Sequence, residues 1–308
     1  MKLVTFEKDG KEKIGALTGE EVVDLSNMAS LSGVTFDRVP SSVISFFETG
    51  ERAAEAAEKA VKCARRTGIG VYKMDDLKLR APIPRPGKLL CLATNYEEHA
   101  REGGGTVPPK EQTTPRVFMK PASNTVIGHR DAIVIPRNAN WIDWECELAV
   151  VMGQTGKFIQ AEEAYDYVGG YTVVNDISER SLEVGKERQP REGDQWFDWL
   201  NGKWFDTAAP MGPCLTLKDE IPDPHDLRIT LRVNGETKQD SNTGRMTFFI
   251  PELIEWISTI VTLEPGDVIA TGTPSGVGRP AGTFLKAGDV VESEVEGIGV
   301  LVNPVVAE

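Results

Sequence analysis

Several features that carry common enzyme chemistries are missing from this sequence of 308 residues. It has only three histidines, and its four cysteines never form a CxxC pair, so neither a histidine-rich metal centre nor a zinc site built from cysteines is expected. Any metal must then be held mainly by oxygen, which favours Mg²⁺, Mn²⁺ or Ca²⁺. No GxGxxG, GxxxxGK[ST] or GxSxG sequence occurs, which removes the dinucleotide-binding, P-loop and serine-hydrolase motifs.

Basic residues and long apolar segments are also scarce. Lysine and arginine number 34 against 47 aspartates and glutamates, for a formal net charge of −13. So acidic a surface repels phosphate backbones, and nucleic-acid binding is not expected. The N-terminus lacks the apolar core of a signal peptide, and no apolar run approaches the roughly 18 residues of a membrane span. We therefore expect a soluble, cytoplasmic protein with no membrane partner.

The chain divides near residue 80. Residues 1–80 indicate a small α/β domain, with a turn at residues 8–10 between two short strands and a strong helix over residues 51–66. Three prolines within residues 82–86 mark the boundary, because proline interrupts both helices and central strands. Residues 81–308 form the second domain, in which short β-rich runs alternate with glycine and proline. The predicted fold is mainly β with some α.

An acidic strand is the most informative segment. With the period of two of a strand, Asp143, Glu145 and Glu147 share one face, which Ala149 and Val151 continue as apolar residues. The carboxylates either form a solvated outer face or point inward. The apolar continuation favours the second arrangement, in which the carboxylates need a partner such as a divalent cation bound by oxygen.

A second acidic position, Asp176, ends an apolar strand-like run. It either lines a site, as residues at strand ends often do, or forms an Asx turn with Asn175. Arg180 follows four residues later and pairs with either an anionic substrate or a neighbouring acid.

A histidine and a glutamate are predicted on one face of a short helix. Asn95 is a plausible helix N-cap with Glu98 three residues on, which resembles a capping box. His99 and Glu102 then lie three residues apart on the helix. They form either a surface contact or a general base whose tautomer is fixed by the carboxylate.

Two later segments complete the candidate chemistry. Lys203 lies between aromatic residues, where partial burial makes its ammonium either a strong electrostatic partner or one half of a simple salt bridge. Residues 271–278 form a glycine-rich loop that either presents backbone N–H groups to a carboxylate or is only a turn.

Together these segments follow the order seen in one family. The sequence resembles the fumarylacetoacetate hydrolase family from about residue 89 to residue 300. The matching stretches are NYEEHAREG, FMKPASNTVIG, IDWECELAVVMG, DYVGGYTVVNDISER, GKWFDTAAPMGP, RVNGETKQ and LEPGDVIATGTPSGVG.

The resemblance assigns roles to individual residues. It implies metal ligands at Glu145, Glu147 and Asp176, and catalytic residues at His99, Glu102 and Lys203. It implies substrate-binding positions at Arg180, Lys120, Gly272 and Thr273. The sequence departs from the family at Glu183, where members often carry glutamine, and in the long charged segment 181–200.

The resemblance also implies a fold and an activity. The fold is a mixed β-sandwich roll with a small variable N-terminal domain, in a homodimer. The activity is C–C bond hydrolysis of a β-diketo acid, such as an acylpyruvate or a fumarylacetoacetate-like compound of aromatic catabolism. Mg²⁺ or Mn²⁺ is the expected cofactor, with Ca²⁺ as a substitute. Alternatives are decarboxylation or isomerisation of a 2-oxo acid such as oxaloacetate or a 2-hydroxy-dienedioate, and a non-catalytic metal or oxo-acid binding protein.

Overall fold

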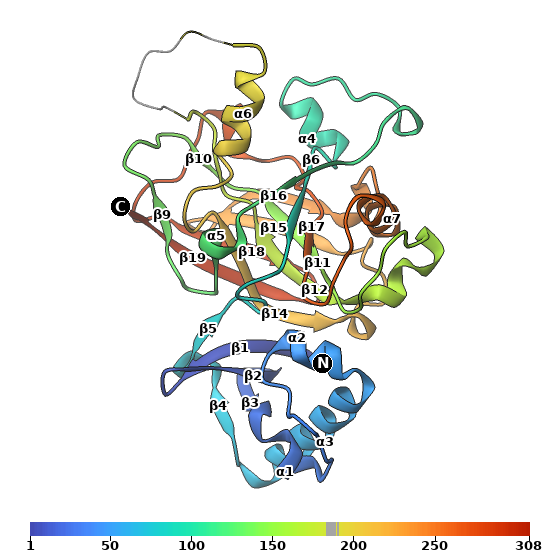
Figure 1. The fold of residues 1–308 in the computed structure, drawn as a ribbon. Coiled ribbons are helices and arrows are strands. Elements are labelled where there is room, and N and C mark those ends of the chain that lie inside the picture. The colour runs from blue at the N-terminus through green and yellow to red at the C-terminus, as the bar shows by residue number, and fades with distance from the viewer. Residues whose placement is uncertain (183–188, 190) are drawn as a thin grey trace.

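The computed structural model describes residues 1–182, 189 and 191–308. Within these residues the strands form a twelve-stranded mixed sheet, a five-stranded sheet and a two-stranded pair, with helices at their edges. The expected architecture, mainly β with some α, is therefore confirmed. Figure 1 shows the N-terminal unit at one end of the molecule and helices α4 and α6 at the other.

The N-terminal unit is a small sheet covered by helices. The predicted turn is present, and Asp9 and Gly10 adopt the positive φ angles of 52° and 70° that a tight hairpin requires. The predicted helix is α3, whose alanine face, including Ala53 and Ala60, is buried. The elements are β1 (Lys2–Lys8), β2 (Lys11–Thr18), β3 (Glu21–Asp24), β4 (Val71–Lys73), β5 (Lys78–Arg80), α1 (Met28–Ser32), α2 (Val43–Thr49) and α3 (Glu51–Thr67).

The sheet of this unit continues into the rest of the chain. Strand β1 pairs antiparallel with β14 (Ala209–Leu217), with Lys2 opposite Thr216 and Leu3 opposite Leu215. The order of the large sheet is therefore β4-β3-β2-β1-β14-β12-β11-β17-β6-β7. The division near residue 80 stays a prediction, and backbone hydrogen bonds cross it.

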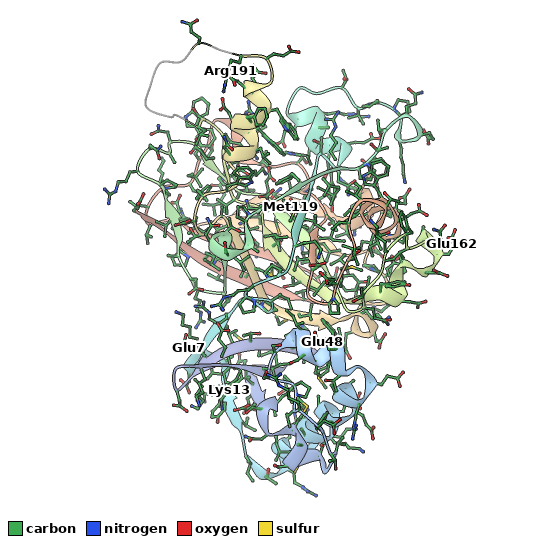
Figure 2. The ribbon with its side chains drawn as sticks, viewed as in Figure 1. Glu7, Lys13, Glu48, Met119, Glu162 and Arg191 are labelled. Atoms are coloured by element: carbon green, nitrogen blue, oxygen red, sulfur yellow. The ribbon has the colours of Figure 1, made fainter. Side chains whose placement is uncertain are left out.

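The large and five-stranded sheets pack face to face. Leu148 and Val150 from the large sheet share one apolar core with Leu231 and Leu301 from the other, and side chains fill the space between the sheets (Figure 2). The remaining strands of the large sheet are β6 (Leu89–Ala93), β7 (Arg116–Met119), β8 (Val126–Ile127), β11 (Cys146–Met152), β12 (Val168–Asn175) and β17 (Val268–Ala270). The five-stranded sheet contains β9 (Ile133–Ile135), β15 (Arg228–Val233), β16 (Glu236–Asn242), β18 (Val290–Val295) and β19 (Gly299–Ala307), and the pair contains β10 (Ile142–Asp143) and β13 (Ser178–Glu179).

Strand β11 is buried on both of its faces. Ala149 and Val151 belong to a second core, shared with the N-terminal unit, and are fully buried. The acidic face of this strand therefore does run into a core rather than into water.

The helices after residue 80 are short. Among the described residues no helix is long and apolar enough to cross a membrane. They are α4 (Glu97–Glu102), α5 (Ala122–Thr125), α6 (Asp194–Asn201), α7 (Ile250–Ile260) and α8 (Gly278–Ala281). The 3₁₀ helices are η1 (Leu25–Asn27), η2 (Met74–Asp76), η3 (Lys110–Gln112), η4 (Ala161–Tyr167), η5 (Lys218–Glu220) and η6 (Thr243–Arg245).

Candidate active site

Three buried carboxylates meet where strands β11 and β12 lie side by side. The register pairs Cys146 with Asn175, so the residues beside them, Glu145 and Asp176, are adjacent, and the Asp176 N–H donates to the Glu145 carbonyl at 2.9 Å. Each of Glu145, Glu147 and Asp176 offers an oxygen within 4.8 Å of the others, and all three residues are at most 6% exposed. The structure thus brings the three sequence-predicted ligands together.

Two buried lysines neutralise part of this negative charge. The Lys203 ammonium donates to Glu145 Oε2 at 2.9 Å and to Asp176 Oδ2 at 2.7 Å. Lys120 also binds Asp176 and donates to the Ile177 carbonyl at 2.9 Å. Lys120, expected to face substrate, therefore has its ammonium on a carboxylate of the cluster.

The two lysines differ in how firmly they hold their protons. Burial acts to lower the pKa of Lys203, but the charges of Asp176 and Glu145 outweigh it and raise that pKa above its usual value. Burial prevails at Lys120, where the pKa is lowered although the Asp176 charge acts to raise it. Lys203 is accordingly the more firmly charged of the two.

Arg180 joins the cluster to a fourth carboxylate. Its Nε donates to Asp143 Oδ2 at 2.9 Å, and its other end binds Glu145. Asp143 does not stack with the other acids on a strand face, because it belongs to β10 and its oxygens also accept the backbone N–H groups of Trp144 and Gly278 at 2.8 and 2.6 Å. The sequence alone does not distinguish this structural role of Asp143 from metal binding, because the partners of Asp143 other than Trp144 are distant in the chain.

Glu147 is the carboxylate that most needs a cation. One oxygen accepts the Gly272 N–H at 2.8 Å, while the other is buried and has no hydrogen-bond partner among the described residues. Burial, together with the charges of Asp176 and Glu145, raises the pKa of Glu147 well above its usual range. A set of three hard oxygen donors with one orphaned buried oxygen fits Mg²⁺ or Mn²⁺.

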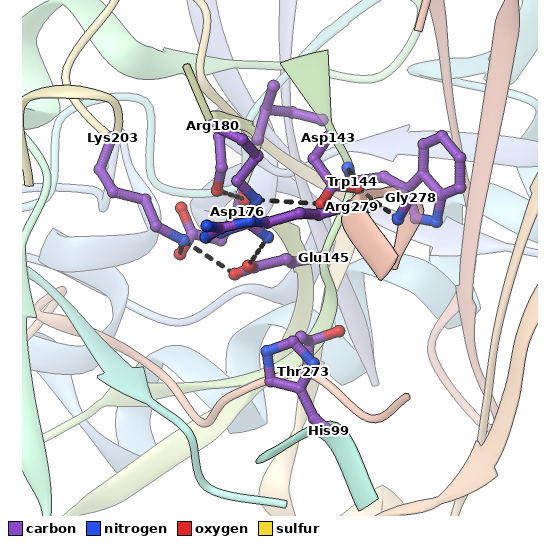
Figure 3. Close-up of polar contacts among 12 residues, drawn as sticks. His99, Asp143, Trp144, Glu145, Asp176, Arg180, Lys203, Thr273, Gly278 and Arg279 are labelled. Carbon is purple, nitrogen blue, oxygen red and sulfur yellow. Dashed lines mark hydrogen bonds and ion pairs between the residues drawn. The ribbon is translucent and has the colours of Figure 1, made fainter. Parts of the chain in front are cut away.

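His99 and Glu102 both lie on α4. Figure 3 shows His99 below the cluster. The His99 Nδ1 atom is 3.7 Å from Glu102 Oε2, beyond hydrogen-bond length, and is otherwise unpartnered among the described residues. Burial acts to raise the pKa of Glu145, but the charges of Lys203, Arg180 and, to a smaller extent, His99 outweigh it and lower that pKa below its usual range. Both oxygens of Glu102 accept the Gly276 N–H at 3.0 Å.

The predicted capping box before this helix is wrong. The N-cap of α4 is Tyr96, which makes no side-chain cap. The Asn95 amide instead donates to the carbonyls of Phe248 and Thr271 at 3.0 and 2.8 Å. Glu98 accepts from Ser241 at 2.7 Å and does not cap the helix. Long-range contacts outcompeted the local motif.

The glycine-rich loop is built into the walls of the site. Gly272 has a φ of 94°, and a Cβ there would come within 2.8 Å of the Asn95 Cβ, so a larger residue would disturb the N–H that Glu147 accepts. The Thr273 hydroxyl donates to the Cys146 carbonyl at 2.9 Å and accepts from Gln239 at 2.8 Å. Substrate binding by Gly272 and Thr273 stays a prediction.

A cavity of about 700 Å³ adjoins the cluster. Arg180 and Thr94 line it, as do Trp196 and Trp199 from α6. It is polar and large enough for a small organic acid. Glu183, one of the departures noted above, lies outside the described residues.

Comparison with known proteins identifies the chain's relatives. Residues 88–306 match the family described as fumarylacetoacetate (FAA) hydrolase C-terminal. The chain is 45% identical over 270 residues to the mitochondrial oxaloacetate tautomerase FAHD2A of Bos taurus, covering 87% of this chain and 81% of the bovine protein. The relatives from rat and human that share this name are also mitochondrial. The cytoplasmic location expected from the sequence is contradicted by these relatives and is wrong.

Solved structures share the fold along the whole chain. Maleylpyruvate hydrolase from Sphingobium sp. SYK-6, in complex with manganese(II) and pyruvate, matches with a TM-score of 0.75 at 27% identity, over 100% of this chain and 99% of that chain. A 5-carboxymethyl-2-hydroxymuconate delta-isomerase from Mycobacterium smegmatis matches with a TM-score of 0.73 at 28% identity, over 100% of both chains. The same fold thus supports hydrolysis in one neighbour and isomerisation in another.

Proposed function

Because this chain belongs to the fumarylacetoacetate hydrolase family, we propose that it is a divalent-metal-dependent enzyme that interconverts the keto and enol forms of oxaloacetate or a similar 2-oxo acid. The observation that carries the proposal is the buried carboxylate cluster, with its orphaned Glu147 oxygen, beside a cavity of about 700 Å³. The 45% identity to an oxaloacetate tautomerase over 87% of the chain favours this reaction over hydrolysis, the main expectation from the sequence.

Glu145, Glu147 and Asp176 would hold Mg²⁺ or Mn²⁺. The ion supplies a Lewis acid that stabilises negative charge on the substrate's oxygens. Lys203 adds positive charge on the same side, and because two carboxylates hold its ammonium in place, it needs no rearrangement when charge develops.

His99 is the proton carrier in this proposal. Its imidazole lies near the cluster, and in this proposal the proton on Nδ1 faces Glu102, whose nearest oxygen is 3.7 Å away. Nε2 is then free to take the proton from the carbon next to the keto group and return it to oxygen, which converts keto to enol. The reverse order converts enol to keto, so one residue serves both directions.

A second candidate is C–C bond hydrolysis of a β-diketo acid. The observation that favours it is the polar cavity beside the carboxylate cluster, together with the fold shared with a maleylpyruvate hydrolase. His99 would then deprotonate a water that attacks the distal carbonyl, and the bond cleaves to pyruvate and a second acid. Decarboxylation of oxaloacetate would use the same cluster without water attack.

Three measurements on the same metal-loaded protein distinguish these reactions. Enol-oxaloacetate is mixed with protein loaded with Mn²⁺, and loss of the enol absorbance is followed while pyruvate is measured separately. Faster loss of enol without pyruvate supports the tautomerase, and pyruvate from oxaloacetate indicates a decarboxylase. Pyruvate from an acylpyruvate, with ¹⁸O from labelled water in the second acid, indicates the hydrolase. Chelator-treated protein is the control, and unchanged enol loss on metal addition refutes the proposal.

A further inference from the structure

The cavity beside the carboxylate cluster is lined by three arginines from separate parts of the chain. Arg116 begins β7, Arg180 follows β13, and Arg279 is the second residue of α8. Arg180 is already engaged by Asp143 and Glu145. The other two have no role in the cluster itself.

The positive charges of Arg116 and Arg279 are not compensated within the described part of the chain. Neither guanidinium makes a hydrogen bond or ion pair there, and both residues are exposed. Of the acids that line the same cavity, Glu179 accepts the N–H groups of Trp141 and Ser181 at 3.3 and 2.6 Å, and Asp198 has a partner of its own. Two uncompensated cations facing one cavity are unexpected in a chain with a net charge of −13, and they predict an anionic ligand.

The backbone that carries Arg279 is held firmly. Buried Asp143 accepts the N–H groups of Gly278 and Arg279 at 2.6 and 3.2 Å. A Cβ at Gly278 would come within 2.0 Å of the Thr283 carbonyl oxygen, so only glycine allows this close approach. Figure 3 shows the Arg279 side chain extending from this loop toward the carboxylate cluster. The guanidinium is therefore presented to the cavity from a fixed base.

We propose that Arg279, assisted by Arg116, binds the distal carboxylate of a dicarboxylic 2-oxo acid and makes this cavity selective for dicarboxylates. The inference rests on the proposed function, in which the keto-acid end of the substrate lies at the carboxylate cluster. A guanidinium binds a carboxylate through two parallel N–H groups, which gives both strength and orientation. A substrate that ends in a methyl group cannot form these charge-assisted hydrogen bonds and binds more weakly.

The test compares two ligands that differ only at their distal end. 2-Oxoglutarate and 2-oxopentanoate both have five carbons, but the second carries a methyl group in place of the distal carboxylate. Their binding to Mn²⁺-loaded protein is measured by calorimetry for the wild type, Arg279→Gln and Arg116→Gln. Arg101→Gln is the control, because Arg101 pairs with Glu97 on the surface of α4 and does not line the cavity.

We expect the wild type and Arg101→Gln to prefer 2-oxoglutarate by roughly 10- to 100-fold. Arg279→Gln should reduce this preference to less than threefold while the affinity for 2-oxopentanoate stays unchanged, and Arg116→Gln should reduce it in part. A wild type without preference, a preference that survives in Arg279→Gln, or an equal loss for both ligands would overturn the inference. If the preference is present but oxaloacetate is not tautomerised, the proposed function fails and the dicarboxylate subsite stands.

Discussion

Replacing Lys203 with methionine should make the stability of the protein depend on a divalent ion. The Lys203 ammonium lies between Glu145 and Asp176, at 2.9 and 2.7 Å, and the residue is 2% exposed. Methionine keeps most of the side-chain volume but removes the charge. Breaking a buried ion pair by removing one partner costs about 3–5 kcal/mol, because the other charge stays buried. In chelator, the free energy of unfolding of Lys203→Met should fall by this amount.

The ion should then restore what the lysine provided. Mn²⁺ bound by the same carboxylates supplies positive charge in the place of the ammonium, and binding to the folded state alone adds about 2.7 kcal/mol at 100 times the dissociation constant. The gain should be larger in Lys203→Met than in the wild type, where ion and ammonium repel each other. Urea unfolding, followed by tryptophan fluorescence with chelator and with Mn²⁺, measures both gains.

Lys88 provides a matched control, because its partners are not part of the carboxylate cluster. Its ammonium also joins two carboxylates, Asp267 and Glu264, each at 2.8 Å, and the Asp267 side chain is 1% exposed. Lys88→Met should lose stability that Mn²⁺ does not restore beyond the wild-type gain. If Mn²⁺ stabilises Lys203→Met no more than it stabilises Lys88→Met, the carboxylates of the cluster do not hold the ion as we propose.

Three further predictions concern the proton carrier, the loop of the anion subsite and a buried histidine. His99→Gln should lower kcat by roughly 10²- to 10⁴-fold with Mn²⁺ affinity unchanged, as stopped-flow and calorimetry would measure; full turnover would exclude His99 as the proton carrier. Gly278→Ala places a Cβ within 2.0 Å of the Thr283 oxygen and should cost about 3 kcal/mol in urea unfolding, whereas an unchanged midpoint would show that the loop yields freely. Burial lowers the pKa of His129 from 6.5 to about 4, so the unfolded chain binds more protons between these values and stability falls as the pH drops through this range, by about 3 kcal/mol in all. His129→Asn keeps an acceptor for the Val302 N–H, which the Nδ1 atom accepts at 3.2 Å, and should abolish that slope; superimposable pH profiles would contradict this account.

The parts of the structure that follow local patterns could be predicted from the sequence. The hairpin at Asp9 and Gly10 and the alanine-rich helix α3 are present because turn residues and helical periodicity act over a few neighbours. Alternation on a strand placed Glu145 and Glu147 on one side, and the strand end placed Asp176 near a site. The family resemblance implied that these three residues bind one metal. Their approach to within 4.8 Å depends on the register of β11 and β12, which no local pattern predicts.

The parts that depend on distant segments could not be predicted. The local sequence predicts Asn95 as a helix cap, but its amide donates to the carbonyls of Phe248 and Thr271, more than 150 residues away. Alternation along the sequence places Asp143 with Glu145 and Glu147, but in the structure Asp143 holds Arg180 and the loop that carries Arg279. Arg279 itself lies in no recognisable motif. Only the folded chain shows that its charge lacks a partner in the described residues and faces the cavity.

The pairing of β1 with β14 has a consequence for synthesis of the chain. Lys2 and Leu3 pair with Thr216 and Leu215, so β1 waits for a partner that is made about 200 residues later. At 5–20 residues per second this interval is roughly 10 to 40 seconds. Until then β2 covers one edge of β1, β5 covers only part of the other, and the first residues offer an open edge to other nascent chains. We therefore expect a chaperone that binds the nascent β1 segment to reduce aggregation of the unfinished chain.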